Sequence, residues 1–413
     1  MREGWGHHKI DEFCLVTDYV ANGSFASLKE NVQYLDQLDF AMLIRYTDHA
    51  NGWNGRHKYV SESAYKFLRK SSLKPGDLIM ANVGDPGNAF LLPNLGMPTT
   101  LGPNSILIRA EKEITSNEFL HYFFLSLEGR QLIDEISAGA AQRKFNKTSF
   151  RGLTIPLPPL EEQQRIVAVL DEAFEGLARA RAHTEANLQN ARELFERQLG
   201  EYFSDTPKEW LSRKLKQITS KIGSGATPRG GAGAYKNEGI SLIRSLNVHD
   251  RWFKEDKLAF IDDEQADKLS NVVIDERDVL LNITGASIAR CCVAPSGFLP
   301  ARVNQHVQII RPDHDVLSPE FLTLMLTSQP YKDGLLKTGE DNGSTRQALT
   351  KALIQNLEVA FPPELVQQEA AVATLEAAET KSKELAEAYQ AKIHDLDDLR
   401  QSLLQKAFAG ELT

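Results

Sequence analysis

The chain has 413 residues, of which 42% are hydrophobic and 25% charged, and its formal net charge is -9. This composition is ordinary for a globular protein of two or more domains and excludes an intrinsically disordered chain. No apolar run reaches about 18 residues and the first residues carry no apolar segment, so we expect a cytoplasmic protein without a membrane span or secretory signal. Cys14, Cys291 and Cys292 form neither a disulfide framework nor a metal-binding pair, and we expect buried thiols.

Residues 1–159 are predicted to form a globular domain of mixed α/β structure. Short β-type runs, such as Leu78 to Met80 and Ser105 to Arg109, lie among Gly, Pro and Asn turn signals. The segment contains as many basic as acidic residues. It can therefore present basic faces to a polyanion although the whole chain is acidic.

A long helix is predicted to follow from residue 160. Pro158-Pro159 suits the start of a helix, because proline fixes φ and its missing N–H would be unpaired in the first turn anyway. Residues 160–209 carry six basic and eleven acidic side chains. Mainly apolar residues recur at a spacing of three and four, at positions 170, 174, 177, 181, 184, 188, 191, 195, 198 and 202. We expect this stripe to face another helix.

The second half of the chain repeats this plan. Residues 210–363 again mix β-type runs with turns, are close to neutral, and end in Pro362-Pro363. Residues 364–413 again form an acidic helical segment, with five basic and ten acidic side chains. Its predicted stripe consists of Val372, Leu375, Ser382, Ala386, Tyr389, Ile393, Leu396, Leu403 and Ala407.

Matching residues show that the two halves are a duplication. SNEFLHYFFLS from Ser116 corresponds to SPEFLTLMLTS from Ser318. Other matches are Leu43-Ile44-Arg45 with Leu242-Ile243-Arg244, Gly76-Asp77 and Gly84 with Arg277-Asp278 and Gly285, and Gln163-Gln164 with Gln367-Gln368 at an offset of 204. A period near 200 residues is too long for a solenoid repeat, so it indicates a duplicated domain, each copy with its own tail.

The predicted fold class is therefore α/β (α+β), with two pseudo-symmetric globular domains separated by an antiparallel coiled coil of the two long helices. An isolated amphipathic helix exposes its apolar stripe to water, and packing the two long helices against each other would bury both stripes. The alternative is that each helix folds back on its own domain only.

Motifs for catalysis are missing. The chain has no GxxxxGK[ST] motif, which excludes a P-loop nucleotide engine. The Pro-Pro pairs lack the preceding Asn and following Tyr of the Asn-Pro-Pro-Tyr motif of amino-methyltransferases. No metal-binding carboxylate set or Ser-His-Asp constellation can be placed. We interpret the chain as a binding and scaffolding protein and expect no catalytic residue and no metal site.

Basic loops are the candidate binding sites, since Lys and Arg contact phosphates, while Arg, Asn and Gln read base edges. Short exposed basic clusters are also common as merely solvated surface, and Arg45 and Arg244 could equally be structural ion-pair partners. The candidate DNA-binding residues are Arg45, Arg56, Lys58, Arg143, Lys144, Lys147, Arg229, Lys236, Arg244, Arg346 and Gln347.

Three further segments carry a resemblance to a known family. They are IPLPPLEEQQRIV from Ile155 with its counterpart VAFPPELVQQEAAV from Val359, the run KIGSGATPRGG from Lys221, and LLQKAFAGEL from Leu403. Together with the duplication they resemble the specificity subunit of type I restriction-modification systems. The second helix start departs from the family pattern, with Glu364-Leu365-Val366 where Leu-Xaa-Glu is more usual.

The resemblance implies that 1–159 and 210–363 are target recognition domains that each read half of a bipartite, asymmetric site in double-stranded DNA. It implies that the helices of 160–209 and 364–413 set the spacer and dock two methyltransferase subunits, with restriction (translocase and nuclease) subunits in the full complex. S-adenosylmethionine, ATP and Mg²⁺ would then belong to the partners and no cofactor to this chain. Two alternatives stay open: the specificity subunit of a type IIB system, and a coiled-coil adaptor that binds only proteins.

Overall fold

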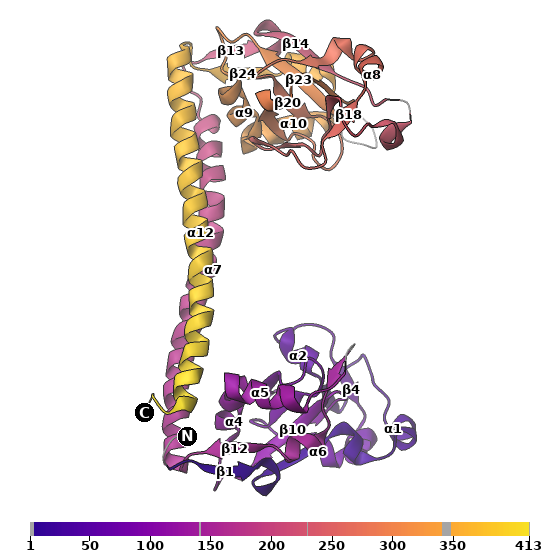
Figure 1. Ribbon diagram of the computed structural model, residues 1–413, viewed down its shortest axis with the longest axis vertical. Helices are drawn as coiled ribbons and strands as arrows, with labels where there is room; N and C mark the ends of the chain where they lie inside the picture. The colour runs from indigo at the N-terminus through magenta and orange to yellow at the C-terminus, as the bar shows by residue number, and fades with distance from the viewer. Residues whose placement is uncertain (1–3, 140–141, 229, 341–347, 413) are drawn as a thin grey trace. The chain divides into compact units, whose positions relative to one another are not determined.

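The computed structural model describes residues 4–139, 142–228, 230–340 and 348–412. The chain divides into two compact units: unit 1 comprises residues 1–184 and 391–413, and unit 2 comprises residues 185–390. Two 45-residue helices, α7 (Leu160–Ser204) and α12 (Leu365–Ala409), each contribute to both units (Figure 1). Each unit therefore contains one lobe of mixed structure and one part of each long helix.

The lobe of unit 1 contains two four-stranded sheets. The first is antiparallel with the order β2-β10-β6-β8, and the second has the order β4-β3-β9-β5 with β3 and β9 parallel. The strands are β2 (Cys14–Asp18), β10 (Ser105–Ala110), β6 (Leu78–Ala81), β8 (Ala89–Leu91), β4 (Lys58–Val60), β3 (Ala41–Ile44), β9 (Thr99–Leu101) and β5 (Ser72–Leu73). The helices are α1 (Phe25–Asn31), α2 (Tyr46–Ala50), α3 (Glu62–Phe67), α4 (Asn117–Leu125), α5 (Leu127–Ile136) and α6 (Lys147–Arg151).

The lobe of unit 2 has the same strand order. Its antiparallel sheet is β14-β23-β20-β21, and its second sheet is β18-β15-β22-β19 with β15 and β22 parallel. The strands are β14 (Thr219–Ser224), β23 (Val307–Pro312), β20 (Val279–Asn282), β21 (Cys291–Val293), β18 (Ala259–Ile261), β15 (Ile240–Ile243), β22 (Ala301–Val303) and β19 (Val273–Ile274). The helices are α8 (Asp263–Asp267), α9 (Pro319–Thr327), α10 (Gln329–Glu340) and α11 (Lys351–Asn356).

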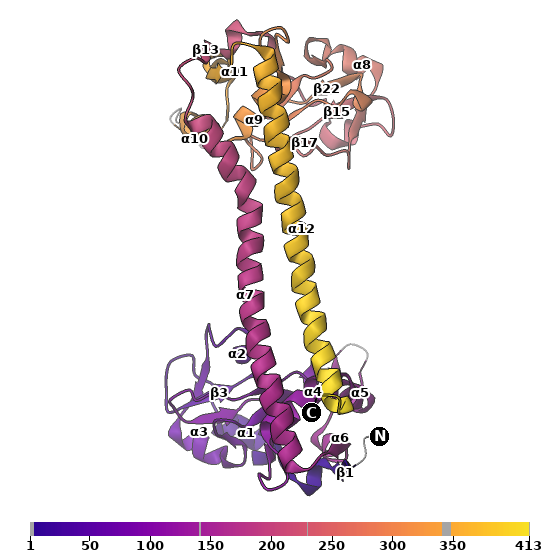
Figure 2. The same cartoon turned by 90° about the vertical axis from the view of Figure 1, so that its left-hand side faces the viewer.

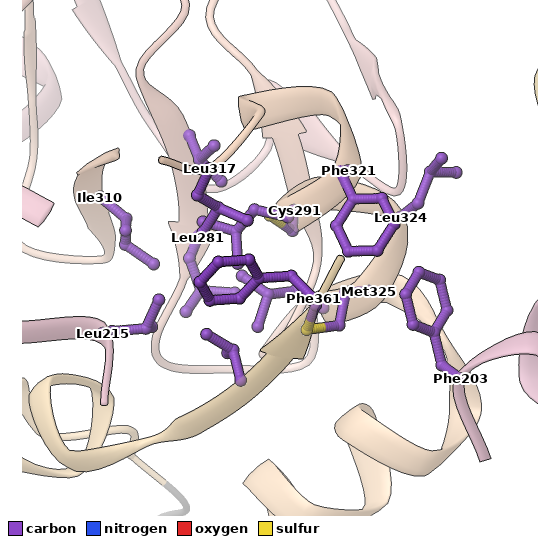
Figure 3. Close-up of a cluster of buried hydrophobic side chains, with 14 of the residues drawn as sticks. Phe203, Leu215, Leu281, Cys291, Ile310, Leu317, Phe321, Leu324, Met325 and Phe361 are labelled. Atoms are coloured by element: carbon purple, nitrogen blue, oxygen red, sulfur yellow. The ribbon is translucent and has the colours of Figure 1, made fainter. Parts of the chain in front are cut away.

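The central strands are mainly apolar because both faces of the antiparallel sheet are covered. In β20, Val279 and Leu281 belong to the cluster that also contains Phe321 of α9, whereas Leu280 belongs to the cluster beneath the second sheet. Successive residues of a strand point to opposite faces, so both sets are buried. Figure 3 shows the first of these clusters, in which Phe361 and Met325 lie among the side chains of the sheet and of α9.

A buried ion pair fixes the same two strands in each lobe. Arg109 bonds to Asp77 in unit 1 (Nε to Oδ1 2.7 Å, Nη2 to Oδ2 2.6 Å), and Arg311 bonds in the same way to Asp278 in unit 2 (2.7 and 2.8 Å). These hydrogen bonds raise the pKa of both arginines. The aspartate follows a residue of positive φ in each copy, Gly76 or Arg277, which explains why this stretch matches between the two halves.

In each lobe, a further two-stranded sheet lies where the chain enters the long helix. β1 (Gly6–Lys9) pairs with β12 (Thr154–Leu157), and β13 (Leu211–Lys214) pairs with β24 (Glu358–Phe361). β12 and β24 lead directly to the Pro-Pro pairs and the helix starts. The first strand of each lobe is therefore joined to the strand that enters the helix.

The two long helices run antiparallel and pack on each other within each unit (Figures 1 and 2). In unit 1, Phe408 of α12 stacks edge-on against Phe119 of α4, with ring centroids 5.5 Å apart. In unit 2, Phe203 of α7 meets Phe321 of α9 in the same way at 5.4 Å. Each lobe therefore contacts the start of the long helix that follows it in the chain and the C-terminal end of the other long helix. The antiparallel pair is confirmed, and the alternative that each helix folds back on its own domain only is wrong.

The predicted stripes are confirmed with one correction. All nine stripe positions of α12 are buried or half-buried, as are those of α7 as far as Phe195. After that, Gln198 is exposed and Leu199 is buried instead, followed by Phe203. The change to steps of four keeps one face turned toward the core of the unit 2 lobe, because a straight helix has 3.6 residues per turn.

The helix starts also correct the predicted alignment. Gln163 donates from Nε2 to the carbonyls of Ile114 (3.0 Å) and Pro158 (2.9 Å), and its Oε1 accepts from the Thr115 hydroxyl (2.7 Å). Gln368 makes the equivalent bonds to the carbonyls of Val316 and Pro362 and accepts from the backbone N–H of Ser318. Gln163 therefore corresponds to Gln368 at an offset of 205, and its predicted match with Gln367 is wrong because the second helix start contains one more residue. We call this buried amide the helix-start glutamine.

Candidate nucleic-acid interface

One end of the antiparallel sheet carries the candidate recognition loops in both units. The end of β6 lies beside the start of β10, and the end of β20 lies beside the start of β23. The next residues include Gly84 (φ +94) and Gly285 (φ +79), which turn the chain in the left-handed region. The same backbone frame therefore presents different loop residues in the two units.

In unit 2 these loops surround an open hollow of about 630 Å³, which we call the unit 2 hollow. It is lined by Ser245, Leu246, His249, Lys254, Lys257, Thr284, Gly285, Ala286, Ser287, Arg290 and His306. Lys254, Lys257 and Arg290 are basic, and no carboxylate is among these lining residues of the described chain. The hollow therefore presents hydrogen-bond donors and positive charge, which suits a nucleic acid.

Buried hydrogen bonds hold the walls of the hollow together. Asn282 is fully buried at the end of β20, and its side-chain amide donates to the carbonyls of Ser245 (2.9 Å) and Val248 (3.2 Å). It also donates to the Ser287 hydroxyl at 3.2 Å. One amide thus connects the wall after β15 to the turn after β20. Because these bonds are buried, they fix the separation of the two walls.

His306 and Thr284 line the hollow at adjacent strand ends. The Thr284 hydroxyl is 2.6 Å from Nδ1 of His306, and Nε2 of His306 is 3.0 Å from the side-chain amide of Gln305. Both ring nitrogens therefore have a partner, and the ring orientation is fixed.

A short hairpin contributes His249 to the lining of the hollow and carries an aromatic stack. It consists of β16 (Val248–His249) and β17 (Trp252–Phe253), and the His249 and Trp252 rings are stacked with centroids 4.2 Å apart. In the turn, Arg251 pairs with Glu196 of α7 and Glu379 of α12. The hairpin is thereby attached to both long helices within unit 2.

The predicted residues of unit 1 are largely engaged in ion pairs. Arg45 bonds to the buried Asp48 (Nη2 to Oδ1 2.6 Å), which favours the structural interpretation of this arginine. The other pairs are Lys58 with Asp36 (2.5 Å), Arg143 with Asp134 (2.8 Å) and Lys147 with Asp18 (2.8 Å), whereas Arg56 and Lys144 are exposed. Arg143 and Lys144 form β11, which pairs with β7 (Val83–Gly84) at the same sheet end as the loops above. The structure therefore brings Arg143 and Lys144 to the candidate interface.

In unit 2, Lys236 pairs with Asp262 at 3.1 Å. The Arg244 guanidinium lies 5.2 Å from the centre of the Tyr235 ring and donates to the carbonyl of Lys257, so this arginine braces a wall of the hollow. Arg229, Arg346 and Gln347 lie outside the described residues. The described neighbour Ala348 bridges to Thr284, so the chain that follows this predicted loop leads to the hollow.

No group of three or more His, Cys, Asp or Glu side chains is arranged for a metal ion in the described parts of the chain. The three cysteines are buried and unbonded, as expected. Of the helices in the described residues, none combines the length and apolar character that a membrane crossing needs.

The family model of the type I restriction modification DNA specificity domain matches the chain twice, at residues 3–185 and 207–394. The chain belongs to this family. Each match covers one lobe together with part of the long helix that follows it, α7 or α12. The duplication inferred from the sequence is therefore a pair of specificity domains.

Relatives and solved structures agree with this membership. The chain is 22% identical over 439 residues to the type I restriction enzyme EcoKI specificity subunit of Escherichia coli K12, with 100% of this chain and 90% of the relative covered. It is 23% identical to a putative type I restriction enzyme MjaX specificity subunit from Methanocaldococcus jannaschii, with 82% and 81% covered. A chain from a study of complex assembly in a type I R-M system superposes with a TM-score of 0.68 at 22% identity (100% and 99% covered), and the HsdS subunit of Thermoanaerobacter tengcongensis with 0.61 at 22% (100% and 98%).

The residues that line the hollow of this specificity-domain protein were not predicted from the sequence. Lys254, Lys257, Arg290 and His306 are scattered along the chain, and only the fold brings them together. The duplication held a signal for one of them. The last residue of β6, Ala81, donates its backbone N–H to the carbonyl of Asn88, and the last residue of β20, Asn282, donates likewise to the carbonyl of Arg290. Asn88 and Arg290 are therefore equivalent, and a cationic side chain in unit 2 replaces an amide in unit 1.

Proposed function

We propose that this chain is the DNA specificity subunit of a type I restriction-modification complex, in which each lobe reads one half of a bipartite, asymmetric site. The observation that carries the proposal is that two specificity domains share one backbone plan and present different side chains at the same sheet end. A common frame with different loop residues suits the recognition of two different half-sites.

We assign the lobes 1–159 and 210–363 to recognition, and the helices of 160–209 and 364–413 to spacing and docking. The exposed faces of the helices carry acidic side chains, such as Glu172 and Glu193 of α7 and Asp395 and Asp398 of α12. Such faces repel DNA and suit a protein partner. Two methyltransferase subunits would dock there, with restriction subunits completing the assembly.

The chemistry belongs to these partners in this proposal. The chain has neither a P-loop nor an Asn-Pro-Pro-Tyr motif, so S-adenosylmethionine, ATP and Mg²⁺ are assigned to the other subunits. The contribution of this chain is to hold the DNA in register, which requires binding energy and rigidity and no reacting group. Nearly neutral lobes, one of them with a basic hollow, joined to acidic helices agree with that division.

The test is to express the chain with its genomic neighbours and to map DNA methylation in a host with and without this gene. We expect one bipartite motif, two specified half-sites around an unspecified spacer, to be methylated only when the gene is present. The purified complex should also bind duplex DNA with an affinity that falls steeply with salt. Methylation that does not depend on the gene, or a complex that leaves DNA unbound at low salt, would refute the proposal and favour a protein-only adaptor.

A further inference from the structure

We propose that the unit 2 hollow binds a guanine of its half-site from the major groove, with Arg290 as the residue that reads the base and Lys257 as a phosphate contact. This inference rests on the proposed function, and it adds the chemical identity of one recognised base and the residue that selects it.

The charge of the hollow gives the class of ligand. Its described lining contains three cationic side chains and no carboxylate, although acidic residues outnumber basic ones in the chain as a whole. Carboxylates accept hydrogen bonds from cytosine N4, and amides pair with adenine. A lining of donors instead matches the part of a base pair that offers acceptors, which is guanine O6 and N7.

The guanidinium of Arg290 has a suitable shape for this contact and is not engaged by another residue of the described chain. It lies in the turn before β21, held by a backbone bond from Asn282 N–H to its carbonyl (2.8 Å). Its side chain is half-buried, yet no ion pair or hydrogen bond engages its guanidinium within the described residues. A partly buried guanidinium without a partner leaves five donors unused, and a planar guanidinium fits O6 and N7 of guanine with two parallel bonds.

The neighbouring arginines show that this freedom is particular to Arg290. Arg244 is held by the Lys257 carbonyl, Arg251 by Glu196 and Glu379, and Arg311 by Asp278. These three are tied into the lobe. In unit 1 the equivalent of Arg290 is Asn88, whose side-chain oxygen accepts from Arg130 at 3.0 Å. The guanine contact should therefore be specific to the second half-site.

The frame of the hollow is rigid enough to discriminate a base. Asn282 ties two walls together from a buried position, and Arg251 attaches the hairpin to both helices. Lys257 (φ +58) lies on the loop that follows the hairpin, and it lines the hollow together with Arg290. Lysine is a flexible point charge, which suits a phosphate better than a base edge.

The experiment measures methylation of a library of bipartite sites by the complete complex, with the wild-type chain and with Arg290→Ala, Arg290→Lys and Lys257→Ala. Arg290→Ala should reduce the preference for guanine at one position of one half-site by about 5- to 150-fold, and Arg290→Lys should not restore it. Lys257→Ala should weaken binding of all sequences alike and reduce the salt dependence by about one charge. Lys268→Ala is the matched control, because Lys268 is exposed, lies outside the hollow and pairs with Glu264 on its own helix turn.

The other positions of the half-site read by unit 2 provide the folding control, since a misfolded lobe loses every position of its half-site at once. If the wild-type complex reads a bipartite site and Arg290→Ala keeps every base preference, the inference is wrong while the proposed function stands. A lost preference for a base other than guanine, or a uniform loss over all sequences, also overturns it. A wild-type complex that reads no site refutes the proposed function and this inference together.

Discussion

The helix-start glutamine makes a quantitative prediction about how each lobe is joined to its long helix. The side chain of Gln163 is 1% exposed and takes part in three hydrogen bonds, to the carbonyls of Ile114 and Pro158 and from the hydroxyl of Thr115. Gln163→Leu keeps a similar volume but leaves three buried polar groups without this partner. At about 1 kcal/mol for each lost bond, the free energy of unfolding of unit 1 should fall by about 3 kcal/mol.

Calorimetry measures this effect, because the two units can unfold in separate transitions. For a unit of about 200 residues, 3 kcal/mol lowers Tm by about 6–12 °C. Hydrogen exchange then identifies the affected unit, with faster exchange expected in β12 and in the first turns of α7. Gln164→Leu is the matched control, since Gln164 is the exposed neighbour on the same helix. Equal Tm values for the two variants would refute the assignment.

The same experiment can be made in unit 2, where Gln368 is the helix-start glutamine. Gln368→Leu should destabilise unit 2 by a similar amount, because Gln368 is fully buried and makes the equivalent bonds to Val316, Pro362 and Ser318. Gln367→Leu should have little effect, since Gln367 is exposed. A larger loss for the Gln367 variant would contradict the offset of 205.

Three more predictions concern burial and charge. Leu199→Ala should cost about 2–5 kcal/mol in urea unfolding, because Leu199 is fully buried, whereas Gln198→Ala should be nearly neutral; the reverse order would contradict the shifted stripe. Asp278→Ala should cost about 3–5 kcal/mol in the same assay, because it removes a fully buried carboxylate that accepts two hydrogen bonds from Arg311 and one from the backbone N–H of Asp275; a loss below 1 kcal/mol would disagree. Burial raises the pKa of the Cys14 and Cys292 thiols to about 12 from an ordinary 9.0, so the unfolded chain loses these protons first and stability should fall as pH rises from about 9 to 12. Both thiols should accordingly resist iodoacetamide in the native protein at pH 8, and rapid alkylation detected by mass spectrometry would contradict the burial.

The sequence was sufficient to predict the parts of the fold that depend on periodicity. The Pro-Pro pairs mark the strand ends before α7 and α12, and the α12 stripe from Val372 to Ala407 is buried or half-buried as predicted. The periodicity of the helix pair does not predict the buried positions where α7 packs against the unit 2 lobe instead of α12. This is why Leu199 is buried there and the predicted Gln198 is exposed. It also cannot detect one extra residue at a helix start, which misaligned Gln163 with Gln367.

The candidate site was less predictable because it depends on residues that only the fold brings together. Adjacent basic residues indicated Arg143 and Lys144, which do lie at the relevant sheet end. The repeat of Arg45 at Arg244 indicated Arg45, which the structure ties to a buried aspartate, whereas no neighbouring basic residue marked Arg290, an isolated arginine between Ala289 and Cys291. A free arginine and a paired one look alike in a sequence, because the partner of a charge is decided by tertiary contacts.

The most direct test of the central claim, that the lobes recognise their half-sites independently, is to exchange one of them. Residues 1–159 would be replaced by the corresponding lobe of a relative with a different known half-site, and the resulting complex would be assayed on a library of bipartite sites. We predict that one half-site changes to that of the donor while the other half-site and the spacer stay as they were. A change in both half-sites at once would contradict the account, because it would mean that the two specificity domains form one continuous reading surface.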